Sequence, residues 1–507
     1  MKNSSADRTI INELYNTKNN TSDKEKIISK SPNIINRFLL IETIFILVLA
    51  IIILRIVNDD AFITLRYARN LIHRLGFVYN PGERVFGITN PLLALLQVVF
   101  SLPVLGNALL GNYILQYALL FGCVILANYY FRDKIMMASL IPLLFFNQQT
   151  VGYLGNEIIL VLFLSLLALI CMDTNKDKLF AFCLSLLYLA RFDGFIFGII
   201  ATCWWLYHRR PISIKKISIH LVIWASLPIL WHLFAYFYYG HFLSNSVTSK
   251  ILGSENVKTY TTVLFEKHLP ALLFGSGNLL NAILIITGLI IFWNRLCIYL
   301  LWFISFSIVY WIIKAPGITV WYFHTLTFVA IFGFAGGVSC LTRKIFSEIC
   351  NLNTPNPSQE GNFSDKLTVF VFAAFISLFF IAGQMNFSWE KQRYDLYKLV
   401  AQEIKKSAEP QTYIEMNEIG ILGYYLNNPV LDHHFLVTPQ GKGKNRFPQI
   451  GQLRELYKPQ FIIINPYREL SQDELNIYKD YSYIGSATSG DKNIRVYIFQ
   501  RNNQIKM

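Results

Sequence analysis

Charged residues are scarce in this sequence of 507 residues. Only 15% of them are Asp, Glu, Lys or Arg, whereas 54% are hydrophobic and the mean hydropathy is +0.40. A soluble globular protein usually carries about 25% charged residues, so an ordinary water-exposed globule is excluded. Repeated apolar runs of about 20 residues predict membrane-spanning helices instead.

Several signatures of soluble proteins are also missing. The sequence has no Walker loop, no GxGxxG motif after a strand and no cysteine spacing typical of zinc sites. None of the seven cysteines follows Cys350, so the C-terminal part has no disulfide framework. Residues 1–36 are polar, which does not fit a secretory signal peptide and predicts a disordered cytoplasmic tail.

The excess of basic residues gives a formal net charge of +14. Lys and Arg lie mostly in short segments between apolar runs, so cytoplasmic loops and lipid head groups explain them better than nucleic acid does. We therefore expect membrane lipids, and no nucleic acid, as partners.

Eleven apolar segments are candidate spans. They are 38–57, 111–131, 134–150, 157–172, 178–190, 194–207, 217–239, 270–292, 295–314, 318–340 and 366–385. A further apolar run, 91–105, is interpreted as a juxtamembrane or re-entrant helix. If it does not cross, the basic segments 132–134, 173–178, 208–216, 294–295 and 342–344 all lie on the cytoplasmic side, as the positive-inside rule requires.

The remaining residues divide the chain into three parts. Residues 1–36 form the tail, 37–385 a transmembrane catalytic domain, and 386–507 a domain that this topology places outside the cytoplasm. In the last part, short strand patterns such as TYIEM and PQFIIIN alternate with helical ones, which predicts an α/β fold. The fold class is thus an α-helical polytopic membrane protein with a C-terminal extracytoplasmic α/β domain.

A polar stretch, NDDAFITLRYARNLIH (58–73), follows the first apolar run. On a helix beginning near residue 60, Arg66, Arg69 or Asn70, and His73 share one face, which predicts an amphipathic helix at the membrane interface. The arginines could simply reach lipid head groups. Asp59 and Asp60 are expected to face a cavity, because an acid that faces lipid costs about 2.5–3.5 kcal/mol.

These residue types suggest a reaction. A carboxylate with basic neighbours can stay ionised and act as a general base, and guanidinium groups can hold a phosphate. The stretch therefore predicts transfer of a group from a lipid phosphate to an acceptor hydroxyl. Asp60 or Asp59 is the candidate base, and Arg66 and Arg69 are candidate phosphate contacts.

Two local signals follow this helix. NPGER predicts a tight turn with Pro81 and Gly82 at its centre, which sets the direction of Glu83. TNP predicts Asn90 as an N-cap with Pro91 in the first helical position. Either signal alone is ordinary.

The sequence DDAFITLRYARNL…GFVYNPGERVFGITNP resembles the first external loop of the GT-C membrane glycosyltransferases. The resemblance is to the bacterial branch that contains the mycobacterial-type terminal arabinofuranosyltransferases. Further stretches are similar to segments of that branch, namely GNE (155–157), RFDG (191–194), YYGHFLSNSVTSK (238–250), WYFHTL (321–326) and NEIGILGYYLNNPVLDHHFLVTP (417–439). Together they span most of the chain from 55 to 439.

The resemblance implies a bacterial plasma-membrane protein with a cytoplasmic N-terminus, an external active site and a polyprenyl-phosphate-linked sugar donor. The acid pair of the family falls on Asp59 and Asp60, its second external acid on Glu157 and its external lysine on Lys250, a candidate donor-phosphate contact. In related enzymes the second acid sometimes binds a metal, so a divalent metal ion is an open question. No other cofactor is expected.

Further residues of the matching segments are candidates for contacts around the site, with the acceptor or with a metal: Glu83, Asn245, Tyr322 and His324. Simpler alternatives stay open. Glu157 could cap its helix, Lys250 could be a solvated loop charge, and Tyr322 could anchor an aromatic belt. Arg191 and Asp193 could form only an ion pair at a turn. The sequence also departs from the family, because Leu243-Ser244-Asn245-Ser246 lacks the usual proline.

The sequence thus predicts an inverting glycosyltransferase, either hexosyl or pentosyl. It would move a sugar from polyprenyl phosphate to a cell-envelope glycan or glycolipid acceptor outside the cytoplasm. The alternative is a transporter or flippase for a lipid-linked sugar, in which the same acids and arginines bind cargo. No clear internal repeat favours the transporter, and the identities of the sugar and the acceptor stay open.

Overall fold

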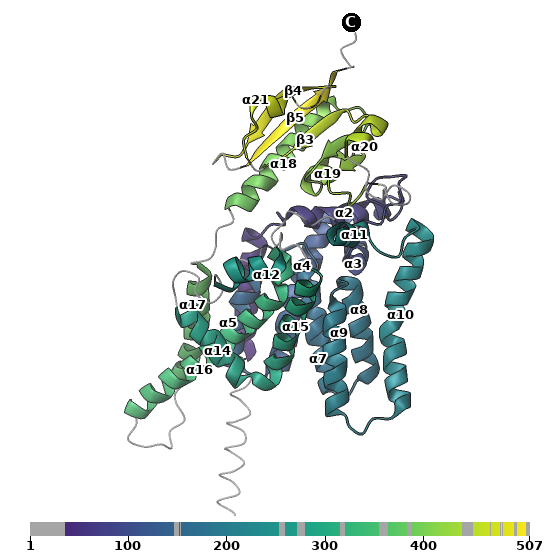
Figure 1. The fold of residues 1–507 in the computed structure, drawn as a ribbon. Helices are drawn as coiled ribbons and strands as arrows, with labels where there is room; N and C mark the ends of the chain where they lie inside the picture. Colours follow the sequence, from purple (N-terminus) through teal and green to yellow (C-terminus); the bar gives the residue numbers. More distant parts are fainter. Residues whose placement is uncertain are drawn as a thin grey trace, which may run out of the picture.

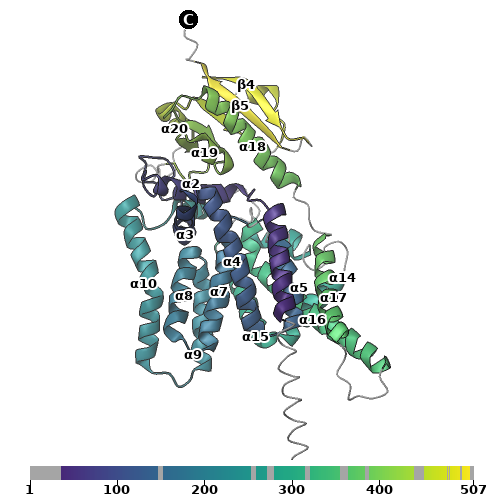
Figure 2. The ribbon, with the colours of Figure 1, turned by 180° about the vertical axis from the view of Figure 1, so that it is seen from behind.

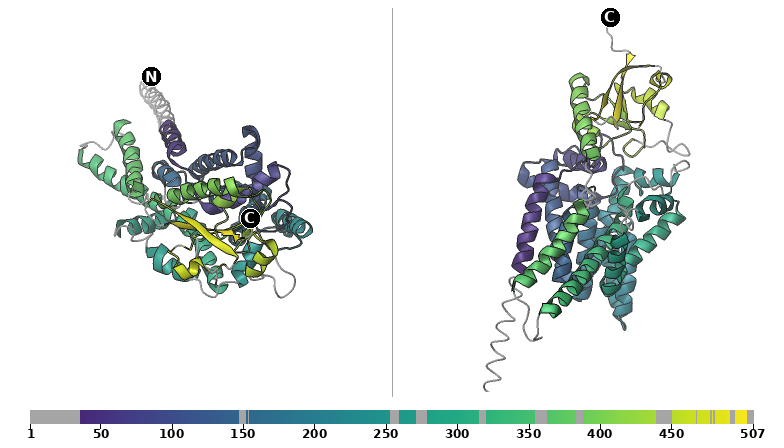
Figure 3. Two further views of the ribbon diagram at one scale, coloured as in Figure 1. Left: turned by 90° about the horizontal axis from the view of Figure 1, so that it is seen from above. Right: turned by 90° about the vertical axis from the view of Figure 1, so that its left-hand side faces the viewer.

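A helical bundle carries a small α/β region at one end (Figure 1). The computed structural model describes residues 36–146, 152, 154–252, 259–270, 279–314, 320–353, 363–382, 388–438, 450–466, 468–476, 478, 480–490 and 494–502. The predicted tail 1–36 lies outside these residues except for Asn36. Figure 3 shows the helical bundle and the α/β region from above and from the side.

A helix occurs at each of the eleven segments expected to span the membrane. The helices are Asn36–Ile53, α4 (Ala108–Phe131), α5 (Lys134–Phe146), α7 (Ile158–Asp173), α8 (Asp177–Ala190), α9 (Gly194–His208), α10 (Ile214–Tyr239), α14 (Leu279–Ile291), α15 (Trp293–Ile312), α16 (His324–Asn353) and α17 (Phe363–Ala382). Among the described residues, five helices are long and apolar enough to cross a membrane: Asn36–Ile53, α4, α10, α15 and α16. The number of spans therefore stays a prediction.

Glycines allow two bundle helices to pack closely. A Cβ on Gly288 of α14 would overlap the backbone oxygen of Gly333 in α16, and a Cβ on Gly337 would overlap the Leu284 oxygen. Small residues commonly let helices in membranes approach to backbone contact. Helices α14 and α16 therefore pack directly against each other.

The loops with many basic residues meet at the end of the bundle away from the sheet. Asp133 pairs with Arg343 at 2.9 Å, Asp173 pairs with Arg295, and the Arg209 guanidinium donates to the Met172 oxygen at 2.6 Å. Residues of all five segments that the charge pattern assigned to one side take part in these contacts. Figure 2 shows the helix Asn36–Ile53 running from this end to the other.

Three short helices lie at the end that carries the C-terminal region, namely α2 (Asp59–Ile72), α3 (Pro91–Ser101) and α11 (Asn245–Leu252). The N-cap Asn58 starts α2 by accepting from the Asp60 N–H at 3.0 Å. As predicted, Asn90 is the N-cap of α3 and Pro91 its first residue. At 11 residues, or about 16 Å, α3 is too short to cross a bilayer core of about 30 Å.

Short helical segments complete the membrane part. They are η1 (Leu102–Val104), α12 (Tyr260–Val263), η2 (Leu264–His268) and η4 (Val320–Phe323). The turn at Asn80–Glu83 forms as predicted, because the Glu83 N–H bonds the Asn80 oxygen at 3.1 Å and Gly82 has a φ of 87°. Glycine adopts this positive φ without strain.

The C-terminal region has the α/β pattern that its sequence predicts. Its elements are α18 (Ser388–Ser407), β1 (Ile414–Met416), α19 (Ile421–Leu426), β2 (Val430–Asp432), α20 (Ile450–Tyr457), β3 (Phe461–Ile464), α21 (Gln472–Leu475), β4 (Tyr481–Thr488) and β5 (Arg495–Arg501). The strand order is β2-β1-β3-β5-β4. β1 is parallel to both β2 and β3, whereas β5 is antiparallel to β3 and β4. Helix α19 faces α2, so the loops after β1 and β2 lie toward the bundle.

Candidate active site

A cavity of about 420 Å³ lies where the bundle meets the C-terminal region. Parts of α2, α9, α11 and α15 form its wall, together with the segment before α3 and Leu436 in the loop after β2. Its polar and charged lining includes Asp60, Thr64, Asn90, Glu157, Arg191, Asp193, Ser246, Tyr310 and Tyr322. This volume is in the usual range for small-molecule sites, about 300–1,000 Å³.

Three charged residues of the lining form an ion network, which we call the cavity cluster: Glu157, Arg191 and Asp193. The Arg191 guanidinium donates to Glu157 Oε1 at 2.6 Å and to both oxygens of Asp193 at 2.8 and 2.9 Å. All three side chains are at most 13% exposed. The predicted ion pair of Arg191 and Asp193 is therefore present, and it includes Glu157.

Burial does not neutralise the Arg191–Asp193 pair. Burial alone would raise the pKa of Asp193, but the positive charge of Arg191 outweighs it and holds that pKa below its ordinary value. Burial alone would lower the pKa of Arg191, but Asp193 and Glu157 raise it well above its ordinary value. The pair is therefore ionised at neutral pH.

Hydrogen bonds connect the cavity cluster to α2. Asn90 Nδ2 donates to Glu157 Oε2 at 2.9 Å, and Thr64 Oγ1 donates to Asn90 Oδ1 at 3.1 Å. Glu157 is the N-cap residue of α7, but its side chain makes no capping hydrogen bond. The capping alternative is thus wrong, because Arg191 and Asn90 bind both carboxylate oxygens.

The two adjacent aspartates have different surroundings. Asp60 lines the cavity and is exposed. Asp59 is 4% exposed, and its carboxylate accepts from the N–H groups of Gly420 and Ile421 at 2.9 and 2.7 Å. Asp60 is therefore the acid of the pair that can meet a substrate, while Asp59 binds the start of α19.

Arg66 and Arg69 also point to the C-terminal region. Arg66 is fully buried; it donates to the backbone oxygens of Tyr79 at 2.9 Å, of Asn428 at 2.7 Å and of Gly423. Arg69 donates to the Tyr424 oxygen at 2.5 Å. We call Asp59, Arg66 and Arg69 the docking cluster.

The docking cluster does not support two expectations from the sequence. A fully buried Arg66 cannot reach lipid head groups, so that alternative is wrong for this residue. Neither Arg66 nor Arg69 is part of the cavity lining. Their role as donor-phosphate contacts stays a prediction, and their hydrogen bonds to backbone oxygens give it no support.

Comparison with known proteins gives a match in structure only. Neither a protein-family model nor a curated protein matches the sequence. Two crystal structures of ArnT from Cupriavidus metallidurans match the architecture, one in the apo state and one bound to undecaprenyl phosphate. The fold of this chain is similar to that of ArnT.

The match to ArnT extends over nearly all of both chains. The TM-score is 0.61 at 10% identity for the apo structure and 0.54 at 12% identity for the lipid-bound one. Each comparison covers 91% of this chain and 97% of the ArnT chain. Such low identity establishes the fold alone, and this ArnT-like fold agrees with the predicted polytopic helical architecture.

Glu83 and Asn245 are not part of the cavity lining of this ArnT-like fold, but both contact the C-terminal region. Glu83 accepts from Asn80 Nδ2 at 2.8 Å and from the Tyr413 hydroxyl. Asn245 Nδ2 donates to the Phe435 and Thr438 oxygens at 3.0 and 3.2 Å. Both side chains thus join the membrane part of the chain to the C-terminal region.

The remaining predicted site residues divide into three cases. Tyr322 lines the cavity, with its ring 5.7 Å from the Arg191 guanidinium carbon. His324 is fully buried beside the rings of Trp302 and Phe306 and is not part of the lining. Lys250 lies in α11, one turn beyond the lining residue Ser246, and its side chain is outside the described part of the structure.

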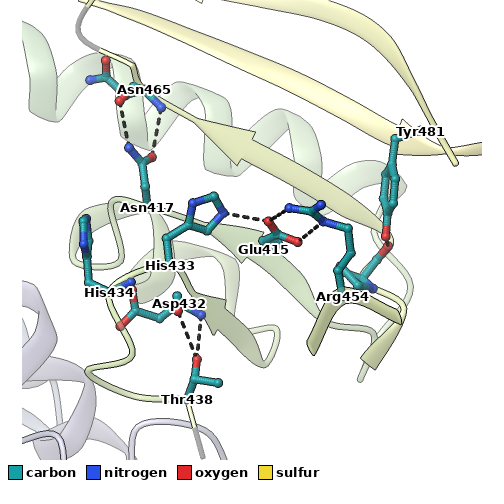
Figure 4. A network of polar contacts seen from close by, with 10 residues as sticks. Glu415, Asn417, Asp432, His433, His434, Thr438, Arg454, Asn465 and Tyr481 are labelled. Carbon is teal, nitrogen blue, oxygen red and sulfur yellow. Dashed lines mark hydrogen bonds and ion pairs between the residues drawn. The ribbon is translucent and has the colours of Figure 1, made fainter. Parts of the chain in front are cut away.

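A second polar network lies in the C-terminal region (Figure 4). Glu415 on β1 is fully buried, and it accepts from Arg454 Nε at 2.7 Å while its other oxygen lies 2.7 Å from His433 Nε2. Asp432 accepts from the backbone N–H groups of His434 and Leu436 at 2.8 and 2.6 Å. Asp432 is thus structural, and it shapes the loop that carries Leu436 to the cavity.

No metal site is evident in the described part of the chain, where no group of three or more His, Cys, Asp or Glu side chains is arranged to hold an ion. Within the cavity, Glu157 is bound by Arg191 and Asn90. We therefore derive no step that uses a metal.

Several lining residues carry no catalytic signal in the sequence. Arg191 and Asp193 were visible only as part of RFDG, and Asn90 only as a helix cap. Tyr310, which donates to Asp193 Oδ2 at 2.9 Å, lies inside an apolar run and gave no signal. Their contacts join segments that are far apart in the sequence.

Proposed function

We propose that this chain is a membrane glycosyltransferase that transfers a sugar from a polyprenyl phosphate to an acceptor hydroxyl outside the cytoplasm. The observation that carries the proposal is that Asp60 and Glu157, two acids almost 100 positions apart, line one cavity at the end that bears the C-terminal region. The similarity of the fold to ArnT, one structure of which holds undecaprenyl phosphate, supports the choice of donor.

The cavity rim suits a lipid-borne donor. Phe195 of α9 and Val309 and Ile313 at the end of α15 belong to the lining, and their side chains are 48%, 37% and 56% exposed. In a membrane, such apolar side chains would face acyl chains. The polyprenyl chain would therefore leave the cavity between α9 and α15, with the sugar and phosphate near Asp60.

Asp60 is the proposed general base. It takes the proton of the acceptor hydroxyl as that oxygen forms a bond to the anomeric carbon. The bond from this carbon to the phosphate oxygen breaks, and the polyprenyl phosphate leaves with the electron pair. Attack from the face opposite the phosphate inverts the anomeric centre, and the sugar is a hexose or pentose.

The cavity cluster is proposed to orient the sugar. Arg191 and Asn90 hold the Glu157 carboxylate in one position, and carboxylates so fixed can accept hydrogen bonds from sugar hydroxyls. Lys250 is retained as the proposed phosphate contact, since α11 places it one turn from Ser246 of the lining. An acceptor glycan or glycolipid would enter beside Leu436.

The side of the membrane follows from the charge pattern. The basic loops contact one another at the end opposite the cavity, and such loops are typically cytoplasmic. This supports the proposal that the C-terminal region and the cavity lie outside in a bacterial plasma membrane, with the N-terminus inside. On this topology, residues 386–507 would be an extracytoplasmic domain.

The test is transfer by the purified full-length protein in liposomes. Synthetic undecaprenyl-phosphate-linked arabinose, mannose and galactose serve as donors, a cell-envelope extract serves as acceptor, and released undecaprenyl phosphate is measured by mass spectrometry. We expect Asp60→Asn to lower the rate at least about 1,000-fold. Asp473→Asn, on exposed α21, is the matched control and should keep full activity.

Two outcomes would contradict the proposal. Full activity of Asp60→Asn would remove the assigned base. Movement of an intact lipid-linked sugar across the liposome, without release of undecaprenyl phosphate, would support the transporter instead.

A further inference from the structure

Helix α2 presents different faces to the cavity and to the C-terminal region. Asp60, Ile63 and Thr64 line the cavity. Asp59, Phe62, Arg66 and Arg69 contact α19 or its neighbours. In an α-helix, adjacent residues point about 100° apart, so Asp59 and Asp60 necessarily serve different surfaces.

The docking cluster binds both ends of α19. Asp59 accepts from the N–H groups of Gly420 and Ile421 at its start, and Arg66 and Arg69 donate to backbone oxygens at its end. These backbone groups are the ones that a short helix cannot pair internally. The charges of α2 thus match the free polar groups of α19 at both ends, which fixes the register of the two helices.

Two glycines permit this close contact. A Cβ on residue 420 would overlap the Asp59 backbone oxygen, and one on residue 423 would overlap the Tyr79 hydroxyl. The Tyr79 hydroxyl itself donates to the Ile419 oxygen at 2.5 Å. The start of α2 therefore rests directly on the backbone of the C-terminal region.

We propose that Asp59 is a positioning residue through which α19 of the C-terminal region fixes the Asp60 carboxylate in the cavity. The inference rests on the proposed function, because it takes Asp60 as the base. The Cα atoms of the two aspartates are one peptide unit apart, about 3.8 Å, so a shift of Asp59 on α19 moves Asp60 as well. The C-terminal region thus forms part of the catalytic machinery without contacting the reacting atoms.

A misplaced base lowers turnover more than it lowers donor binding. We expect Asp59→Asn, which removes the charge and one of the two acceptor oxygens, to lower kcat about 10-fold to 100-fold. The donor KM should change by no more than about twofold. The pH dependence of kcat should keep its shape, because the titrating base is still Asp60.

The decisive experiment is a double-mutant cycle with Asp59→Asn and Gly420→Ala in the full-length protein, using the synthetic donor that supports transfer. Gly420→Ala disturbs the same contact from the other side. The double variant should therefore lose no more kcat than the worse single variant, because residues in contact are not additive. Gly451→Ala, where a Cβ meets open space, is the matched glycine control and should keep wild-type kcat.

Arg69→Gln tests the same contact at the far end of α19 if Asp59→Asn does not fold. A positioning role lowers kcat and leaves the donor KM unchanged, whereas a phosphate contact raises the donor KM. Hydrogen exchange at Gly420 and Ile421 adds a readout besides activity, and it should speed up in Asp59→Asn.

The inference is overturned if Asp60→Asn is inactive while Asp59→Asn and Gly420→Ala keep wild-type kcat. It is also overturned if the two losses multiply, or if Asp59→Asn abolishes the acidic limb of the pH profile, since Asp59 would then act by itself. An active Asp60→Asn variant would instead refute the proposed function, so the two failures are distinguishable.

Discussion

The cavity cluster and the docking cluster contain the same residue types but use them differently. In the cavity cluster, Arg191 binds the carboxylates of Glu157 and Asp193, which line an open volume. In the docking cluster, Arg66 and Arg69 bind backbone oxygens within a packed contact. On the proposed function, an acid–arginine pattern indicates chemistry only where a substrate can reach it. Elsewhere the same pattern joins two parts of a chain.

The largest effect on stability is expected at Arg191. Arg191→Met would leave Glu157 and Asp193 buried without their cation, which should lower the free energy of unfolding by about 3–5 kcal/mol. Transfer activity should fall as well. Unfolding in mixed micelles can be followed with a thiol-reactive dye, because all seven cysteines precede residue 351 and therefore report on the bundle.

Arg343→Met is the control for this variant. Arg343 pairs with Asp133 but its side chain is 58% exposed, so its loss should cost less than about 1 kcal/mol. Equal effects of the two changes would show that Arg191 is not a buried partner of two carboxylates.

A smaller effect is expected at Arg66. Arg66→Met would remove the guanidinium donor from the oxygens of Gly423 and Asn428, at a cost of about 2–3 kcal/mol. The Tyr79 oxygen would keep the Asn70 side-chain amide as a donor at 2.8 Å. The same unfolding assay measures this cost, with exposed Arg55→Met as the control. The donor KM should not change. A large increase would indicate that Arg66 contacts the donor phosphate, and the two clusters would then not differ in the way described here.

The smallest effect is expected in the C-terminal network. Burial alone would raise the pKa of Glu415, but hydrogen bonds from Arg454 and His433 hold it below its ordinary value of 4.5. Ionised Glu415 therefore stabilises the fold above about pH 4.5, and this contribution is lost as the pH falls through the lower, folded-state pKa.

Arg454→Met should remove about 1–2 kcal/mol at neutral pH, since His433 still contacts Glu415. Acid unfolding should then begin at a higher pH than in the wild type. The β-sheet amide I band reports on this region, because all the strands among the described residues belong to it. The exposed pair Arg468–Glu474 offers a control, and an Arg468→Met variant should unfold at the wild-type pH.

Much of the fold follows from local sequence signals. Each expected apolar segment contains a helix, and the α/β alternation after residue 410 matches the strands and helices. The basic segments lie at one end of the bundle, which is the arrangement that their charge pattern predicts. These features depend on composition and on periodicity, which a single sequence contains.

The candidate site was only partly predictable. Asp60 and Glu157 were expected at the site and lie in one cavity. The separate use of Asp59 could not be foreseen, because its partners Gly420 and Ile421 are about 360 residues away. Two of the three backbone oxygens that Arg66 binds, those of Gly423 and Asn428, also belong to the C-terminal region, so its assignment to the phosphate could not be checked from the sequence. Residue type shows what a side chain can bind, and tertiary contacts decide what it does bind.

The apolar rim between α9 and α15 has a kinetic consequence. On the proposed function, the donor reaches Asp60 from within the bilayer, so the relevant concentration is its mole fraction among the lipids. Adding inert phospholipid should slow the enzyme even at a constant bulk amount of donor, as expected for surface dilution. Rates measured in different detergents or vesicles are therefore comparable only at equal donor density per unit of membrane area.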